Sequence, residues 1–409
     1  MLWGMSDPSR QPAAPGPRNP FRPSFGTSPY YLAGRAELLQ DFELSLAEGP
    51  GSPHRTILAS GLRGVGKTVL LNEIEDKARA QGWIVLRAYP NSDMIAELVE
   101  TTIPTAITSI EQPPERKLSG ASITGVGSFR TEAHSRAEEL RSVPTLITRL
   151  RELSDAITGT GILITLDELQ SADLDQLHRL ATAVQDLMRD ERDIAFVCAG
   201  LPHGVDTLLQ HEGTTFLRRA FRVDLHAVPT EEVSKTLAIT AADSGRPFTD
   251  DALGRATDIC RGYPYLIQVV GALSWAAAGI DGSGTIEATH VETASQRAID
   301  RMTSHVHRPA LSRLPEGEMN FLRAMAAISV DEGASEPESV SAAAPATRAV
   351  KTGDIAAHLG VEPRGLSTWR SRLITRDLIE PAGFGRVRFT LPYMEDYIRQ
   401  QDAKRQTDA

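Results

Sequence analysis

The sequence has only two cysteines in 409 residues, Cys198 and Cys260, and each stands inside an apolar segment. The two could pair, but lone buried thiols in a reducing cytosol fit this pattern better. Long apolar runs are also lacking, because the longest, 265–280, is interrupted by Gln268 and Ser274 and is too short for a membrane span. The first residues contain neither a basic region nor a long apolar core, so we do not expect them to form a secretory signal. We therefore expect a cytoplasmic protein without a membrane partner.

Basic residues are too few for a surface that coats nucleic acid, since 43 Lys and Arg stand against 53 Asp and Glu, a net charge of −10. The charge is uneven. Residues 347–409 hold 11 basic and 8 acidic residues, a net of +3 that leaves −13 for the rest. A local DNA contact near the C-terminus therefore stays open. The length predicts two or three domains, and an apolar share of 41% predicts that most of the chain is globular.

A glycine-rich segment at residues 61–68 matches the phosphate-binding pattern G-x-x-x-x-G-K-[ST] in full. It follows an apolar run and precedes a helical pattern, which is the strand–loop–helix setting that the pattern needs. Its glycines let backbone N–H groups converge on phosphate oxygens, and the next helix N-terminus adds partial positive charge. We expect Lys67 to reach the β- and γ-phosphates of ATP and the Thr68 hydroxyl to hold Mg²⁺. The predicted nucleotide contacts here are Gly61, Arg63, Gly64, Val65, Gly66, Lys67, Thr68 and Val69.

Apolar runs that alternate with amphipathic helices predict a parallel α/β sheet over residues 26–228. The predicted strands cover residues 56–60, 84–88, 162–166, 194–199 and 221–225. The third strand ends in Asp167 and Glu168, at the edge where parallel strands open to a ligand. We expect Asp167 to hold Mg²⁺, directly or through water, and Glu168 to polarise an attacking water. A strand before an acidic helix cap would look the same, but the phosphate loop upstream favours the catalytic interpretation.

Further segments carry a resemblance to known proteins. Residues 31–39 look like the G-R-x-x-x-L entry box of AAA+ ATPases of the origin-initiator clade and of STAND signalling NTPases. Residues 261–266 resemble the G-x-P box of their helical lid, although composition alone would indicate only a helix boundary there. With the extra strand and the adjacent glutamate, residues 27–395 resemble an actinobacterial-type AAA ATPase of this group. The resemblance implies that Leu32, Gly34 and Arg35 lie by the adenine, and that Gly262 and Pro264 belong to a lid over the nucleotide.

Two positions depart from that family. Its fourth strand should end in a polar sensor residue, yet residues 197–201 read Val-Cys-Ala-Gly-Leu, which puts γ-phosphate sensing there in doubt. An arginine finger is also not fixed by the sequence. Arg218, Arg219 and Arg222 lie just before or within the fifth strand, where AAA+ proteins often place one, but a basic cluster is usually a solvated face. Arg219 is the candidate, acting in cis or in trans.

The C-terminal residues have the pattern of a winged helix. A short helix at 352–360 ends in glycine, and a turn leads to a second helix with a buried stripe of Leu366, Trp369, Leu373 and Ile374. A wing strand follows, with Val387, Phe389 and Leu391 inward and Arg386, Arg388 and Thr390 outward. Contacts to double-stranded DNA are expected from Arg364, Arg370, Arg372, Arg386 and Arg388. Winged helices also serve as protein docking or dimer modules, so the partner stays open.

The predicted fold class is α/β: a parallel-sheet P-loop NTPase of the AAA+, additional-strand type, with an all-helical lid and a C-terminal winged helix. We expect a tail at 1–25, the α/β domain at 26–228, the lid at 229–312, a winged-helix domain at 313–400 and a tail at 401–409. Residues 331–347 are expected to be a disordered loop, and residues 120–127 a β-hairpin or flexible loop without a phosphate site.

Two functions remain open. The first is an ATPase that uses ATP and Mg²⁺, releases ADP, and moves its lid and winged helix to control DNA binding or remodelling. The second is a STAND-like switch that holds nucleotide, forms a homo-oligomer on a cue and docks protein without DNA. The complete phosphate loop argues against a third, a DNA-binding regulator with a vestigial nucleotide site. Fold analogy does not choose among replication, transposition, defence and transcription.

Overall fold

The computed structural model describes residues 18–24, 26–111, 144–331 and 348–407. The chain forms two compact units: the first contains residues 1–37, 61–69 and 225–409, and the second contains residues 38–60 and 70–224. The predicted loop at 120–127 and all but one residue of the predicted disordered loop at 331–347 lie outside the described residues.

The second unit is built on a five-stranded sheet with the spatial order β2-β3-β4-β1-β5. Its strands are β1 (Thr56–Gly61), β2 (Ile84–Ala88), β3 (Ile162–Leu166), β4 (Ile194–Gly200) and β5 (Phe221–Leu225). The pairs β2–β3, β3–β4 and β4–β1 are parallel. All residues of β3 and β4 are buried, which explains their unbroken apolar sequence. The predicted sheet is confirmed, with β1 and β4 each one residue longer than expected.

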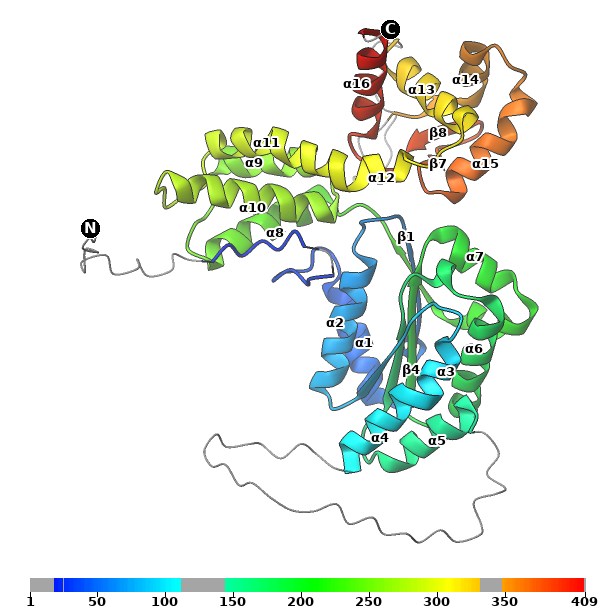
Figure 1. Ribbon diagram of the computed structural model, residues 1–409. Coiled ribbons are helices and arrows are strands. Elements are labelled where there is room, and N and C mark those ends of the chain that lie inside the picture. The colour runs from blue at the N-terminus through cyan, green and yellow to red at the C-terminus, as the bar shows by residue number, and fades with distance from the viewer. Residues whose placement is uncertain (1–17, 25, 112–143, 332–347, 408–409) are drawn as a thin grey trace, which may run out of the picture. The chain divides into compact units, whose positions relative to one another are not determined.

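Helices cover both faces of this sheet (Figure 1). One face carries α1 (Ala36–Glu48) and α2 (Lys67–Ala80), and the other carries α5 (Leu146–Ala156), α6 (Leu174–Arg189) and α7 (Pro202–Gln210). Between β2 and α5, α3 (Met94–Glu97) continues through a π-helical turn (Leu98–Thr102) into α4 (Ile103–Glu111). Asp173 caps α6 by accepting hydrogen bonds from the backbone of residues 175 and 176. The apolar stripe of α6, formed by Leu177, Leu180, Val184 and Leu187, is buried.

From residue 230 to residue 331 the first unit is built of helices. Its first four helices are α8 (Thr230–Asp243), α9 (Asp250–Cys260), α10 (Pro264–Ile280) and α11 (Ala288–Met302). The apolar stretch at 265–280 lies within α10, which has ten buried residues among seventeen. Among the described residues, no helix is long and apolar enough to cross a membrane. Cys198 and Cys260 are both free and buried, and burial raises the pKa of each thiol.

The C-terminal part of the same unit joins helices to a small sheet. Its helices are α12 (Arg308–Leu311), α13 (Glu316–Asp331), α14 (Thr352–Leu359), α15 (Ser367–Thr375) and α16 (Met394–Thr407). The strands β6 (Val350–Lys351), β7 (Ile379–Pro381) and β8 (Arg386–Phe389) are antiparallel in the order β6-β8-β7. Helix α16 runs to Thr407, so most of the predicted tail at 401–409 is helical.

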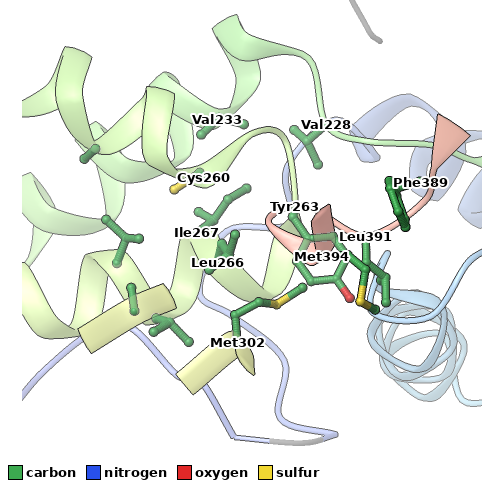
Figure 2. Packing of buried hydrophobic residues seen from close by; sticks show 14 of the residues in the cluster. Val228, Val233, Cys260, Tyr263, Leu266, Ile267, Met302, Phe389, Leu391 and Met394 are labelled. Atoms are coloured by element: carbon green, nitrogen blue, oxygen red, sulfur yellow. The ribbon is translucent and has the colours of Figure 1, made fainter. Parts of the chain in front are cut away.

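One hydrophobic core joins α8–α11 to these C-terminal elements. Figure 2 shows the side chain of Tyr263 beside Leu391 and Met394, with Met302 of α11 below them and Cys260 farther to the left. The hydroxyl of Tyr393 donates a hydrogen bond to the carbonyl of Ile259 over 2.9 Å. Because the buried apolar surface is shared, the two helical parts are tied together by packing.

Part of the N-terminal segment that was predicted to be a tail, residues 1–25, packs against the first unit. Phe21 is 3% exposed and lies on α10 at Gly271, where an added Cβ would come within 2.3 Å of its ring. The Asn19 side chain donates to the carbonyl of Ala272 over 2.8 Å. Only a glycine at position 271 leaves room for this ring, so a tertiary contact orders a segment whose proline-rich composition suggests a tail.

Candidate functional site

The phosphate-loop segment belongs to the first unit and has the backbone that its glycines permit. Gly64 and Gly66 have φ values of +76° and +95°, a region that L side chains rarely adopt. A Cβ at Gly61 would lie 2.7 Å from the Val65 side chain, so close packing also requires glycine there. Lys67 is 6% exposed, and its amine donates to the carbonyls of residues 61 and 62 over 2.8 Å each. The loop thus curls around its own lysine, with Thr68 and Val69 following in α2.

Residues 261–266, predicted to be the G-x-P box of a lid, contact this loop within the same unit. The Tyr263 hydroxyl donates to the carbonyl of Arg63 over 2.9 Å, and a Cβ at Gly64 would be only 1.9 Å from that hydroxyl. Gly262 has φ of +70°, and a Cβ there would meet the carbonyl of Val228 at 2.6 Å. Pro264 starts α10. The middle residue of the box, which the sequence did not single out, therefore makes the contact with the phosphate loop.

The predicted adenine wall lies at the start of α8. The backbone N–H of Gly34 donates to a carboxylate oxygen of Glu232 over 3.3 Å. Arg35 donates to the carbonyl of His226 over 3.3 Å, and burial lowers the pKa of its guanidinium. Leu32 is half-buried. Polar contacts thus hold the predicted entry box against residues 226 and 232 of the same unit, and its place beside an adenine stays a prediction.

An acidic residue of the C-terminal part also faces the phosphate loop. Asp377 follows α15, is 6% exposed, and has φ of +55°. Burial raises the pKa of its carboxyl to about 6, against the opposing influence of the positive charges on Lys67 and Arg63. Its Oδ2 atom is buried without a hydrogen-bond partner. Nothing in the local sequence marks this residue, because the proximity arises only from tertiary packing.

The paired acids lie in the second unit, at the carboxyl end of β3. Glu168 is exposed and has φ of +53°, a strained conformation for a residue with a side chain. Asp167 Oδ1 accepts the backbone N–H of Glu168 over 2.8 Å, which helps to hold this turn. The side chain of Gln170 donates to Glu168 Oε2, and its Oε1 accepts the backbone N–H of Leu201 over 2.9 Å. Gln170 is a further residue that sequence reasoning missed, and it belongs to this strand edge.

A Mg²⁺ ion fits the chemistry of the predicted ligands. Thr68 offers a hydroxyl and Asp167 a carboxylate, and both are the hard oxygen donors that Mg²⁺ prefers. Within the described ranges, no group of three or more His, Cys, Asp or Glu side chains gathers into a metal site.

The candidate for an arginine finger, Arg219, lies at the surface of the second unit. Arg219 is exposed at the end of a short 3₁₀ segment, η5 (Glu212–Arg219), directly before β5. Its neighbour Arg218 donates to the carbonyl of Leu209 over 2.8 Å and is therefore occupied in holding α7. The role of Arg219 stays a prediction.

The arginines predicted to contact DNA differ in their surroundings. Arg364 and Arg386 are exposed, and Arg370 is half-buried. Arg388 forms an ion pair with Glu380 at 2.5 Å, and Arg372 lies 3.7 Å from Glu318 of α13. The inward positions of the wing strand are buried as predicted, but Thr390 is buried too, contrary to its predicted outward position. Its hydroxyl donates to the carbonyl of Asp377, which draws it inside.

Comparisons with known proteins agree with this architecture. A family model described as "AAA ATPase domain" matches residues 31–197, and one described as "Domain of unknown function (DUF8462)" matches residues 304–398. No curated protein matches the chain. The ORC2 protein of Aeropyrum pernix, solved as ADPNP-ADP complexes, is similar with a TM-score of 0.58 at 16% identity, covering 93% of this chain and 98% of that one. CDC6P from Pyrobaculum aerophilum gives a TM-score of 0.46 at 16% identity, covering 93% and 97%. The chain has the P-loop fold of AAA+ proteins, with a five-stranded parallel sheet and a helical C-terminal part.

Proposed function

We propose that this protein is an ATPase that binds ATP with Mg²⁺ and hydrolyses it to ADP and phosphate. The observation that carries the proposal is the phosphate loop, where two glycines in the positive-φ region precede a buried lysine at the start of a helix. The match of residues 31–197 to an AAA ATPase domain supports it. Phosphate oxygens would replace the carbonyls of residues 61 and 62 as partners of the Lys67 amine.

Hydrolysis needs a positioned water and compensation of the charge that develops on the phosphates. Glu168 is exposed at the end of β3 and would accept a proton from the attacking water, while Lys67 would neutralise charge on the β- and γ-phosphates. Bound Mg²⁺ would supply further neutralisation, held by Thr68 and Asp167. Rate enhancement would come mainly from positioning and electrostatics. Arg219 would add charge in cis or in trans.

The nucleotide state would control the lid and the C-terminal part, which we interpret as a winged helix. Two hydrogen bonds and one electrostatic interaction within the first unit support this coupling. Tyr263 bonds to the carbonyl of Arg63 in the phosphate loop, and Tyr393 bonds to the carbonyl of Ile259 at the end of α9. The charge of Lys67 acts on the carboxyl of Asp377. A triphosphate brings negative charge toward Asp377, and repulsion between them would shift the C-terminal part.

The output of this movement would be controlled binding or remodelling of duplex DNA through α15 and the β7–β8 wing. Among the described residues, no acidic side chain of this module forms an ion pair with Arg364, Arg370 or Arg386, which are therefore the predicted contacts available to DNA. One observation favours the second function, a nucleotide switch that docks protein and forms a homo-oligomer. Arg388 and Arg372 are paired with Glu380 and Glu318, and Phe384 at the wing tip is fully exposed.

The test is to measure ATP turnover with and without duplex DNA while recording the oligomeric state with ATP, with ADP and without nucleotide. ATP turnover that DNA stimulates supports the DNA-directed ATPase. Nucleotide-dependent assembly without a DNA effect supports the switch. Failure to bind ATP in any condition would contradict both.

A further inference from the structure

Gln170 connects two strand ends of the second unit through a single side-chain amide. Its Oε1 accepts the backbone N–H of Leu201 over 2.9 Å, directly after β4, and its Nε2 donates to Glu168 Oε2, just after β3. The orientation of this amide is fixed by chemistry, because a backbone N–H can only donate and a carboxylate can only accept. The amide nitrogen must therefore face Glu168.

The surroundings hold the side chain in this position. A Cβ at Gly204 would lie 2.5 Å from the Gln170 Cβ and 3.0 Å from its Cα. A Cβ at Gly200 would lie 3.1 Å from Gln170 Oε1 and 2.8 Å from the Leu169 Cβ. Any larger residue at either glycine would displace the Gln170 segment. The two glycines thus leave a space that this segment fills, which restricts the rotamers of the amide.

Glu168 needs such support. Its backbone is strained at φ of +53°, and its side chain is exposed to water, where it would otherwise sample several rotamers. A bond to Oε2 leaves Oε1 available to a water. A neutral amide donor fixes the carboxylate without cancelling its charge, whereas a cation would pair with it.

The end of β4 supplies no polar side chain for this purpose. Residues 197–201 are apolar, and β4 is buried throughout. In this chain the backbone N–H of Leu201, at that strand end, is connected to the Glu168 carboxylate through the Gln170 amide.

We propose that Gln170 is a positioning residue. It orients the Glu168 carboxylate toward the water that attacks the γ-phosphate, and it links this orientation to the end of β4. The inference rests on the proposed ATPase function. A movement of the β4 end would change the orientation of Glu168 through this amide, without any direct contact between Gln170 and the nucleotide.

The test compares Gln170→Glu and Gln170→Met with wild type in the full chain. Glutamate keeps the length and an acceptor for Leu201 but repels Glu168, and methionine keeps the length and removes both hydrogen bonds. We expect kcat for ATP hydrolysis to fall about 10- to 100-fold, more for Gln170→Glu, while ATP affinity stays within about two-fold. The pH dependence of kcat should change in Gln170→Glu, since a new charge lies beside the base.

Gln176→Glu is the matched control. Gln176 also bridges two backbone groups of this unit, accepting from Ile95 over 2.9 Å and donating to the carbonyl of Ser92, but it bonds to no catalytic side chain. It should lose as much thermal stability as the Gln170 variants and keep its kcat. A second check adds Gln170→Met to a Glu168→Gln chain, where it should cause no further loss of turnover.

Three results would overturn the inference. They are unchanged kcat in both Gln170 variants, a loss of kcat that the control shares, and additive losses in the double variant. The proposed function is tested separately by wild type and Glu168→Gln alone. If wild type hydrolyses no ATP, or Glu168→Gln is fully active, the proposed function fails, and the role of Gln170 fails with it.

Discussion

The carboxyl edge of β3 and β4 and the arginine-bearing face of the C-terminal part use polar side chains in opposite ways. At the strand edge, Asp167 and Gln170 hold Glu168 in a strained turn and leave its carboxylate open to water. In the C-terminal part, Arg388 and Arg372 are engaged by acids of the same module. A site that preserves exposed, oriented charge is prepared for chemistry. A face whose arginines are paired with acids of the same module gives weaker support for nucleic-acid binding than a face of unpaired arginines would.

The largest expected effect tests the phosphate loop, on which the proposed role of the strand-edge acids depends. Lys67→Ala should reduce ATP affinity by about 100-fold or more, because it removes the buried amine that would meet the phosphates. Titration with a fluorescent ATP analogue measures this. Lys77→Ala is the control, since Lys77 lies on the same helix and pairs with Glu43 over 2.8 Å at the surface. Equal affinities in the two variants would mean that the phosphate loop does not hold the nucleotide.

The next effect tests whether paired arginines limit DNA binding. Glu380→Gln should free Arg388 and tighten binding to a duplex by about three- to ten-fold, with about one more unit in the salt dependence. The control is Glu362→Gln, because Glu362 is an exposed acid beside the turn before α15 and gives the same change in net charge. Fluorescence anisotropy at two salt concentrations distinguishes the two. An equal gain in both variants would show that net charge matters and the ion pair does not.

A smaller effect tests the link between the phosphate loop and the lid. Tyr263→Phe removes the 2.9 Å hydrogen bond to the carbonyl of Arg63 and should weaken ATP binding by about five-fold, the value of one neutral hydrogen bond. Tyr265→Phe, two residues along, removes a hydroxyl without this contact. Calorimetric titration with ATP compares them. No difference between the two variants would remove this bond from the proposed coupling.

The smallest effect concerns pH and the packing of the C-terminal part. Burial lowers the pKa of His307 to about 4, although the carbonyl of Pro392 and the charge of Asp396 oppose this. Below its usual pKa of 6.5 the unfolded chain takes up a proton that the folded chain excludes. The contribution of a neutral His307 to stability is therefore fully present above pH 6.5 and is lost as the pH falls toward 4.

We expect the melting temperature of wild type to fall more between pH 7 and pH 5 than that of His307→Gln. The comparison uses the difference between the two slopes, because Asp377 titrates in the same range with the opposite sign and is common to both chains. Parallel melting curves across this pH range would show that His307 is not buried as described.

The sequence predicted the sheet well because its information is local. Buried parallel strands are continuous apolar runs, and the phosphate loop is a contiguous pattern, so β3 and the segment at 61–68 could be assigned without tertiary contacts. The contacts of Gln170, Asp377 and Phe21 could not be predicted, since each joins residues distant in the chain or depends on the space that a glycine leaves. Of these three residues, Gln170 is the easiest to propose from the sequence, because a polar residue so close to Glu168 is a reasonable candidate even without a structure.

The central claim is that Glu168 activates water for hydrolysis of an ATP bound at the phosphate loop. Single-turnover hydrolysis and ATP binding, measured side by side for wild type and Glu168→Gln, test it most directly. We expect the variant to bind ATP with an affinity within about two-fold of wild type. We expect its rate of hydrolysis to be reduced by about 100-fold or more. Hydrolysis by Glu168→Gln at the wild-type rate would contradict the claim.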